Sequence, residues 1–172
     1  MRSMLGQVQE RSSISTPVEA GMPSGASLSL KEIPYDYVAR FLLTGVRGNR
    51  VQDVVNISVD GAFVAVTIAY SFIPPLTQYT PSNDRAIDFK YTIVDSGSGR
   101  ELQNRSIHNI AGLGDPNGLR PFRPLAKPML FMPRSTIRFE IEEVSDGDLF
   151  IGAELFIVLH GYKILGYGTG PA

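Results

Sequence analysis

The chain has 172 residues and a formal net charge of −1, from 16 Lys and Arg against 17 Asp and Glu. A near-neutral chain offers no general electrostatic attraction to nucleic acid or to an acidic membrane surface. The absence of cysteine excludes disulfide bonds and thiolate metal ligands. We also expect no signal peptide and no membrane helix, because the first residues lack an apolar core and no apolar run approaches the roughly 20 residues of a membrane span.

Residues 1–32 differ in composition from the rest, being rich in Ser, Thr, Gln, Gly and Pro. Such a segment has too little apolar surface to offset the entropy of ordering, so it predicts an extended, flexible N-terminal arm. Two interpretations stay open: a disordered terminus, or an arm that orders against a neighbouring subunit. In the second, the anchors would be its scattered apolar residues, Met4, Leu5, Val8, Ile14, Val18, Met22 and Leu28.

Residues 33–165 carry the strand signals of a single β-domain. Apolar and polar residues alternate in residues 35–46, which predicts a strand with one buried face, and a second strand follows over 51–59. Asp60-Gly61 is typical of a two-residue type I′ hairpin turn. Residues 62–72 are apolar on both faces, which predicts a central strand ended by Pro74-Pro75.

The middle of the chain contains a loop, one clear strand and one weaker one. Residues 76–85 are predicted to form a loop, and residues 87–93 alternate regularly between apolar and polar. A Ser-Gly-Ser-Gly turn at 96–99 leads to a further predicted strand over 101–109. We find no convincing helix anywhere in the chain.

Residues 112–133 form a long segment rich in glycine and proline, with prolines at 116, 121, 124, 128 and 133. A structureless loop of this length is uncommon in a compact domain and usually indicates a function or a partner contact. Its extended parts should be polyproline-like or edge strand, because each proline removes a backbone donor.

Residues 128–163 read as two strands joined by an acidic turn at 145–148. Ile137, Phe139 and Ile141 alternate with charged residues, and Glu142-Glu143 interrupts that alternation as a β-bulge would. The last strand is apolar on both faces, so it must be covered on both.

Residues 166–172 are predicted to be a flexible Gly-rich tail. The whole pattern predicts an all-β fold: an antiparallel, jelly-roll-like β-sandwich with an extended N-terminal arm.

Little in the sequence indicates catalysis. The two histidines, His108 and His160, belong to no metal-ligand or nucleophile motif. We expect His160, on the outer face of an apolar strand, to be a hydrogen-bonded structural residue, and His108 to be solvated. The glycines of 112–116 lack the Lys-Ser/Thr that a phosphate-binding loop requires. We therefore assign no catalytic, cofactor-binding or metal-binding residue and expect neither a cofactor nor enzyme activity.

One acidic run could in principle hold calcium. It consists of Glu140, Glu142, Glu143, Asp146, Asp148 and Glu154. Asp146 and Asp148 flank a glycine and could present carboxylate oxygens, but a third oxygen ligand at the usual offset is missing, which favours a solvated turn.

Basic residues gather between 97 and 138, whereas residues 140–154 are acidic without a Lys or Arg. The simple interpretation is two solvated patches of little energetic consequence. The alternative is a head-to-tail contact in which the basic segment of one copy meets the acidic segment of the next.

Four short segments resemble small β-sandwich structural proteins of tailed bacteriophages. They are residues 60–64 (DGAFV), 95–102 (DSGSGREL), 128–133 (PMLFMP) and 156–163 (FIVLHGYK). The resemblance covers about residues 50–165 and departs from the pattern at Gly61, where the pattern has Ala, and around residues 74–84, where this chain is longer. It implies a virion component that is not an enzyme and is repeated around the capsid, neck or tail.

On this basis we expect a virion structural protein of a tailed bacteriophage, assembled in the host cytoplasm, with capsid decoration placed before neck or tail. Its expected partners are further copies of itself and other virion proteins, such as major capsid or neck and tail subunits, but not nucleic acid or membrane. The alternative is a glycan- or receptor-binding module for host attachment. Tyr79 beside Asn83, Asp84 and Arg85 could stack on and hydrogen-bond a sugar.

Overall fold

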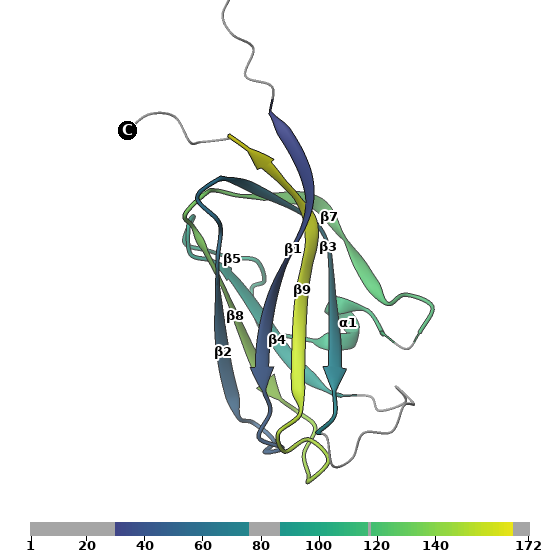
Figure 1. Ribbon diagram of the computed structural model, residues 1–172. Coiled ribbons are helices and arrows are strands. Elements are labelled where there is room, and N and C mark those ends of the chain that lie inside the picture. The colour runs from purple at the N-terminus through teal and green to yellow at the C-terminus, as the bar shows by residue number, and fades with distance from the viewer. Residues whose placement is uncertain (1–29, 76–86, 117, 167–172) are drawn as a thin grey trace, which may run out of the picture.

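The computed structural model describes residues 30–75, 87–116 and 118–166. They form two antiparallel sheets that pack face to face, which confirms the predicted β-sandwich (Figure 1). The first sheet has the order β1-β9-β3-β7, made of Lys31–Leu42, Glu154–Leu165, Gly61–Ile73 and Phe122–Phe131. The second has the order β2-β8-β4-β5, made of Arg50–Asn56, Thr136–Glu143, Phe89–Asp95 and Arg100–Glu101.

The short strand β6 (Ile107–His108) also pairs with β4, at Lys90 and Tyr91, whereas β5 pairs at Val94 and Asp95. Together β5 and β6 form one interrupted strand, because the chain between them bends away and returns to β4. With these two counted as one, eight strands are divided between the sheets so that most consecutive strands lie in opposite sheets. That arrangement is a jelly roll.

The topology corrects two predicted hairpins. Strand β2 pairs with β8 and strand β3 with β7 and β9, so the turn at Asp60-Gly61 carries the chain from one sheet to the other. Neither residue has a positive φ, which a type I′ turn requires. Likewise β8 and β9 lie in opposite sheets, and residues 144–153 connect the two sheets instead of closing a hairpin. The turn at 96–99 does join paired strands, β4 and β5.

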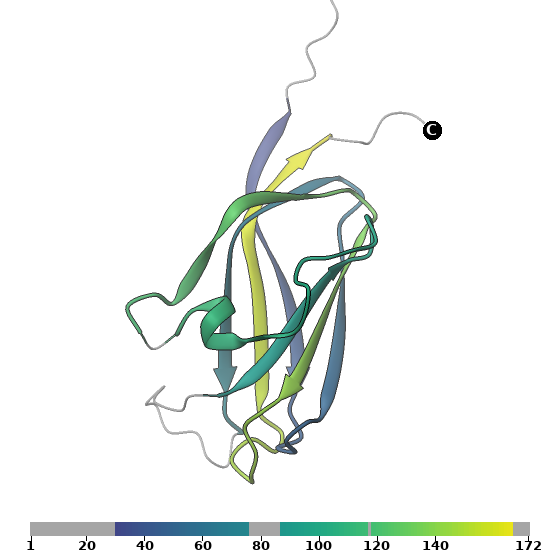
Figure 2. The same cartoon turned by 180° about the vertical axis from the view of Figure 1, so that it is seen from behind.

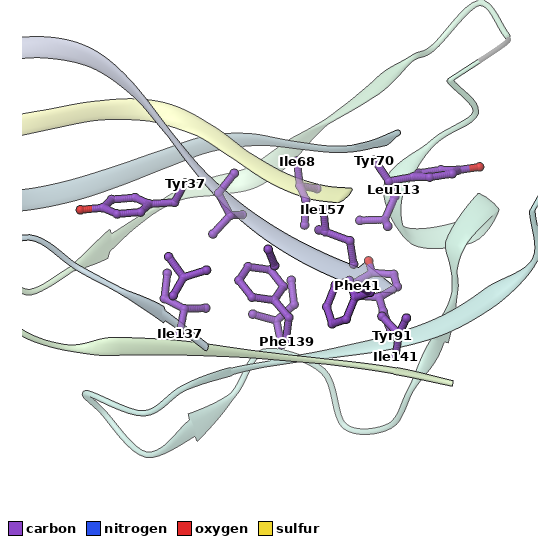
Figure 3. Close-up of a cluster of buried hydrophobic side chains, with 14 of the residues drawn as sticks. Tyr37, Phe41, Ile68, Tyr70, Tyr91, Leu113, Ile137, Phe139, Ile141 and Ile157 are labelled. Atoms are coloured by element: carbon purple, nitrogen blue, oxygen red, sulfur yellow. The ribbon is translucent and has the colours of Figure 1, made fainter. Parts of the chain in front are cut away.

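The core lies between the sheets, where the apolar positions of the alternating strands meet. Ile137, Phe139 and Ile141 of β8 are buried, as the alternation predicted, and they face Tyr37 and Phe41 of the first sheet (Figure 3). Strand β3 lies between β9 and β7, which confirms that it is a central strand.

One helix was missed. The single turn α1 (Asn109–Leu113) begins at the last residue of the predicted strand at 101–109, of which only the short β5 and β6 are strand, and it lies between β4 and β7 (Figure 2). The fully buried side chain of Asn109 fixes its start, because its Nδ2 donates to the Ile87 carbonyl at 2.7 Å and to the Tyr70 hydroxyl at 3.0 Å. A five-residue helix is too short to show a 3.6-residue period in the sequence.

The Gly- and Pro-rich segment 112–133 is more regular than predicted, because β7 occupies ten of its residues. Strand β7 pairs only with β3 and is therefore an edge strand, as its prolines indicated. The predicted bulge at Glu142-Glu143 is absent, since β8 keeps an unbroken register with both neighbours. The register shift lies instead in β3, between Ala65 and Thr67.

Candidate interaction surfaces

The outer face of the first sheet carries an apolar row that crosses all four strands. Val38 of β1 pairs with Val158 of β9, Val158 pairs with Ala69 of β3, and Ala69 pairs with Phe122 of β7. The two ends of the row are exposed, Val38 to 47% and Phe122 to 51%, while the two central residues are half-buried. The side chains face outward because Tyr37, Ala39 and the other alternate residues fill the core.

Further apolar side chains extend this row toward the end of the sheet where β1 ends. We call the combined surface the apolar face, and it comprises Val38, Leu42, Ala69, Ile73, Phe122, Phe156 and Val158. The core covers the inner face of β9, as predicted, whereas nothing among the described residues lies over Phe156 and Val158 on the outer face, which are only half-buried. A cover for this outer face stays a prediction.

Charged residues on the same face pair with one another. Asp36 lies opposite His160 in the register, and its Oδ1 is 3.0 Å from Nδ1 of that histidine. This confirms His160 as a hydrogen-bonded residue on the outer face. Arg40 lies diagonally opposite Glu154, because Arg40 faces Phe156 and Glu154 faces Leu42 in the register, and the two side chains form an ion pair. The hydrogen-bonded pair Asp36–His160 therefore borders the apolar face and the ion pair Arg40–Glu154 lies within it, so the described charged side chains of this face have partners in the same chain.

The outer face of the second sheet has the opposite character. Glu142 at its centre accepts from Arg50 Nη2 at 2.8 Å and from Lys90 Nζ at 2.9 Å, and these three residues form one cross-strand row. The hydrogen bond from Lys90, followed by that from Arg50, holds the pKa of the Glu142 carboxyl below its ordinary value. In the next row, the Thr92 and Ser106 hydroxyls lie 2.9 Å apart.

These rows border a shallow polar groove of about 360 Å³. It is lined by Arg50, Val51, Gln52, Ser106, Glu140, Ile141 and Glu142. A groove of this size is within the range of small-ligand sites, and its polar groups suit an uncharged, hydroxyl-rich molecule because its charges are already paired.

The acidic run does not form the free patch that the sequence suggested. Glu140 is 3.0 Å from Arg138 Nε, Glu142 is held by Arg50 and Lys90, and Glu154 is paired with Arg40. Ion pairs within the chain thus neutralise three of the six residues of the run. The head-to-tail contact between copies stays a prediction, and reversing the charge at Glu140 or Glu142 to test it would also break ion pairs within one chain.

Glu143, which follows Glu142 at the end of β8, is buried on the core face of the sheet. The alternation of Ile137, Phe139 and Ile141 places its side chain on that face. Its carboxylate accepts from the backbone N of Thr44 at 3.0 Å and of Gly45 at 2.9 Å, from the Thr44 hydroxyl at 3.0 Å, and from Asn49 Nδ2 at 2.8 Å. It therefore fixes the connection between β1 and β2. This role of Glu143 was not predicted from the sequence, although the period of two was the signal for it.

Lys163 is the second buried charge, and it too was missed. Its Nζ lies 3.9 Å from the centroid of the Tyr35 ring and 3.5 Å from Oδ1 of Asp60. The hydrogen bond from Ser58 is the main cause that holds the pKa of Asp60 below its ordinary value, and Lys163 adds to it. This cluster closes the end of the sandwich where β1 begins.

The other residues considered for chemistry are not brought together. His108 Nε2 is 3.5 Å from Asp88, and the Ser106 hydroxyl bonds to Thr92. Within residues 30–75, 87–116 and 118–166, no three His, Cys, Asp or Glu side chains group as metal ligands. In that same part of the chain no helix is long and apolar enough to cross a membrane. Tyr79, Asn83, Asp84 and Arg85 lie outside the described residues.

Taken together, the described residues form an antiparallel jelly roll with one apolar outer face and one ionic outer face. No protein-family model matches the chain, and no curated protein matches it either. It is similar to a solved protein from Sulfurospirillum deleyianum, with a TM-score of 0.37 and 12% identity over 78% of this chain and 99% of that one.

Two structures from infectious bursal disease virus are also similar. One is of the Gx strain, with a TM-score of 0.32 and 13% identity over 82% of this chain and 32% of that chain. The other is a VP2 subviral particle, with a TM-score of 0.30 and 14% identity over 81% of this chain and 38% of that chain. Similarities this weak define no family, so the function is argued from the residues of the chain itself.

Proposed function

We propose that this protein is a structural component of the virion of a tailed bacteriophage and acts by binding further copies of itself and neighbouring virion proteins. Capsid decoration is the first placement and the neck or tail the second. The observation that carries the proposal is the apolar face across all four strands of the first sheet. The jelly roll supports it as an architecture that capsid domains share with lectins, and so does the sequence resemblance to phage proteins.

The contrast between the two outer faces is the physical basis of this proposal. Val38 and Phe122 are about half exposed at the two ends of a continuous apolar row, whereas the row Arg50–Glu142–Lys90 on the second sheet is ionic. Proteins that stay monomeric rarely expose a contiguous apolar patch larger than a few hundred Å². Burying such a patch against another subunit is favourable by about 25 cal/mol for each Å² of apolar surface, before the costs of association.

Neither nucleic acid nor a membrane is needed in this role, and no catalysis is proposed. The protein would be assembled into particles in the host cytoplasm. The N-terminal arm and the segment 112–133, which ends in edge strand β7, would make the contacts, while the sandwich acts as a rigid spacer.

The test is the state of association of the full chain, by mass photometry and negative-stain electron microscopy. We expect ordered multimers, and we expect the double variant Val38→Asp and Phe122→Asp to abolish them, because two carboxylates would have to be desolvated. Val54→Asp is the matched control, since Val54 is exposed to 46% on the outer side of β2 in the second sheet. A full chain that stays monomeric at micromolar concentration, alone and with phage particles, would contradict the proposal.

The polar groove supports a second candidate, a glycan-binding module for host attachment. The charged groups of the groove are already paired, so the Gln52 amide and the Ser106 hydroxyl are the groups that would form hydrogen bonds with sugar hydroxyls. A glycan array would show binding that Gln52→Ala weakens. Tyr79→Ala tests the loop suggested by the sequence, and the absence of any glycan binding would remove this candidate.

A further inference from the structure

We propose that the apolar face is the docking site for the N-terminal segment, residues 1–29, of a neighbouring copy of the same chain. This inference rests on the proposed self-association and names the two surfaces that meet.

The face itself limits what can cover it. Its apolar row is bordered on one side by the pair Asp36–His160 and on the other by Arg40–Glu154. Because these charges are satisfied within the chain, a charged occupant would gain no partner and would lose its hydration. The occupant should therefore be apolar where it meets the row and have no net charge.

Residues 1–29 have this chemistry. Their charged residues are Arg2, Glu10, Arg11 and Glu19, which sum to zero. Apart from the adjacent Met4 and Leu5, their larger apolar residues are spread singly over the segment instead of forming one block: Met4, Leu5, Val8, Ile14, Val18, Met22 and Leu28. An extended chain of this kind can place several apolar side chains in turn over a sheet face.

The direction of β1 and the length of residues 1–29 favour docking on a neighbouring copy over docking on the same chain. Strand β1 begins at Lys31, and this end of it projects beyond the body of the sandwich beside the end of β9 (Figure 1). Residues before Lys31 that continue its direction lead away from their own apolar face. Val38 lies about 23 Å back along β1, so the same chain could reach it only after a full reversal. A segment of 29 residues can extend about 95 Å, which is enough to cross to another subunit.

The absence of cysteine allows a direct test in the full chain. One population carries Ile14→Cys and a second carries Val38→Cys. The two are mixed, treated with a short bismaleimide and analysed by mass spectrometry, while mass photometry follows assembly of the same samples. Val54→Cys replaces Val38→Cys in the matched control, because the two valines are equally exposed on opposite sheets. Val8→Cys and Val18→Cys repeat the experiment at other positions of the segment.

We expect several-fold more crosslinked heterodimer with Val38→Cys than with Val54→Cys, for at least one position of the segment. Multimers that form without this preference would overturn the docking proposal and leave self-association intact. If the chains stay monomeric, self-association fails as well. A double variant, Ile14→Cys with Val38→Cys, that crosslinks only within one chain would show that the segment covers its own face, and would equally overturn the assignment to a neighbour.

Discussion

Glu143 and Gly45 are 98 positions apart in the sequence, yet the backbone N–H of Gly45 donates to the Glu143 carboxylate at 2.9 Å. The same carboxylate also binds Thr44 and Asn49, so one buried side chain holds the whole connection between β1 and β2. This connection passes from one sheet to the other, and the carboxylate therefore joins the two halves of the sandwich at one end.

Removing this carboxylate should cost much of the stability of the domain. We expect Glu143→Ala to lower the free energy of unfolding by about 3 kcal/mol, because several buried donors lose their acceptor at once. Glu143→Gln should cost less, since it keeps one acceptor oxygen. Urea denaturation followed by circular dichroism measures both. Glu101→Ala, at an exposed position, is the control and should be neutral; an equally small effect of Glu143→Ala would contradict the role of the carboxylate.

The row Arg50–Glu142–Lys90 predicts a pH dependence. Hydrogen bonds from Lys90 and Arg50 hold the folded-state pKa of Glu142 below its ordinary value of 4.5. Its contribution to stability is therefore present above about pH 4.5 and is lost as the pH falls through the lowered folded-state value. Glu142→Gln should be less stable than the natural chain near pH 7, and this difference should shrink as the pH falls below 4.5. A difference that does not change with pH would show that the charge is not involved.

The stacking of Lys163 on Tyr35 can be tested with two substitutions at the aromatic position. Tyr35→Phe keeps the ring 3.9 Å below the ammonium group and should leave the stability nearly unchanged. Tyr35→Leu keeps apolar contact but removes the ring, and should lower the free energy of unfolding by about 1 kcal/mol. Thermal unfolding of the three chains gives the comparison. Equal stability of the Phe and Leu variants would show that the cation–π interaction does not contribute to stability.

Gly161 is required by the close approach of β9 to β3. A Cβ atom at this position would lie 1.8 Å from the Val64 carbonyl oxygen, an atom of the backbone that cannot move away alone. We expect Gly161→Ala to destabilise the domain by about 3 kcal/mol or more. The neighbouring His160→Ala loses only an exposed pair and should change stability by less than about 1 kcal/mol. Similar thermal midpoints for the two variants would contradict this account.

These residues also show which parts of the structure the sequence could predict. The alternation of Ile137, Phe139 and Ile141 was enough to place β8 and its buried face, because a period of two depends only on neighbouring residues. The sheet that each strand joins was not predictable in the same way. Asp60-Gly61 indicates that the chain turns, but the turn is equally compatible with a hairpin and with a crossing to the other sheet.

The two buried charges were missed for a related reason. Glu143 looked like an interruption of the strand alternation, because the groups that donate hydrogen bonds to it, on Thr44 and Gly45, come from a distant part of the chain. The acidic run looked free because its partners Arg40, Arg50 and Lys90 lie outside it. The apolar face could be suspected from Phe156 and Val158, but its extent across four strands depends on a register that only the fold supplies.

Both margins of the first sheet lack some of the backbone donors that an additional strand would need. On β7, Pro124 and Pro128 remove backbone donors, and on β1 the N–H of Arg40 is already held by Asp53 at 2.9 Å. Growth of this sheet by edge-to-edge stacking, the route to fibrils, is thereby hindered on either side. Concentrated solutions of this protein should therefore yield finite, detergent-dissociable particles, with no thioflavin-binding aggregates.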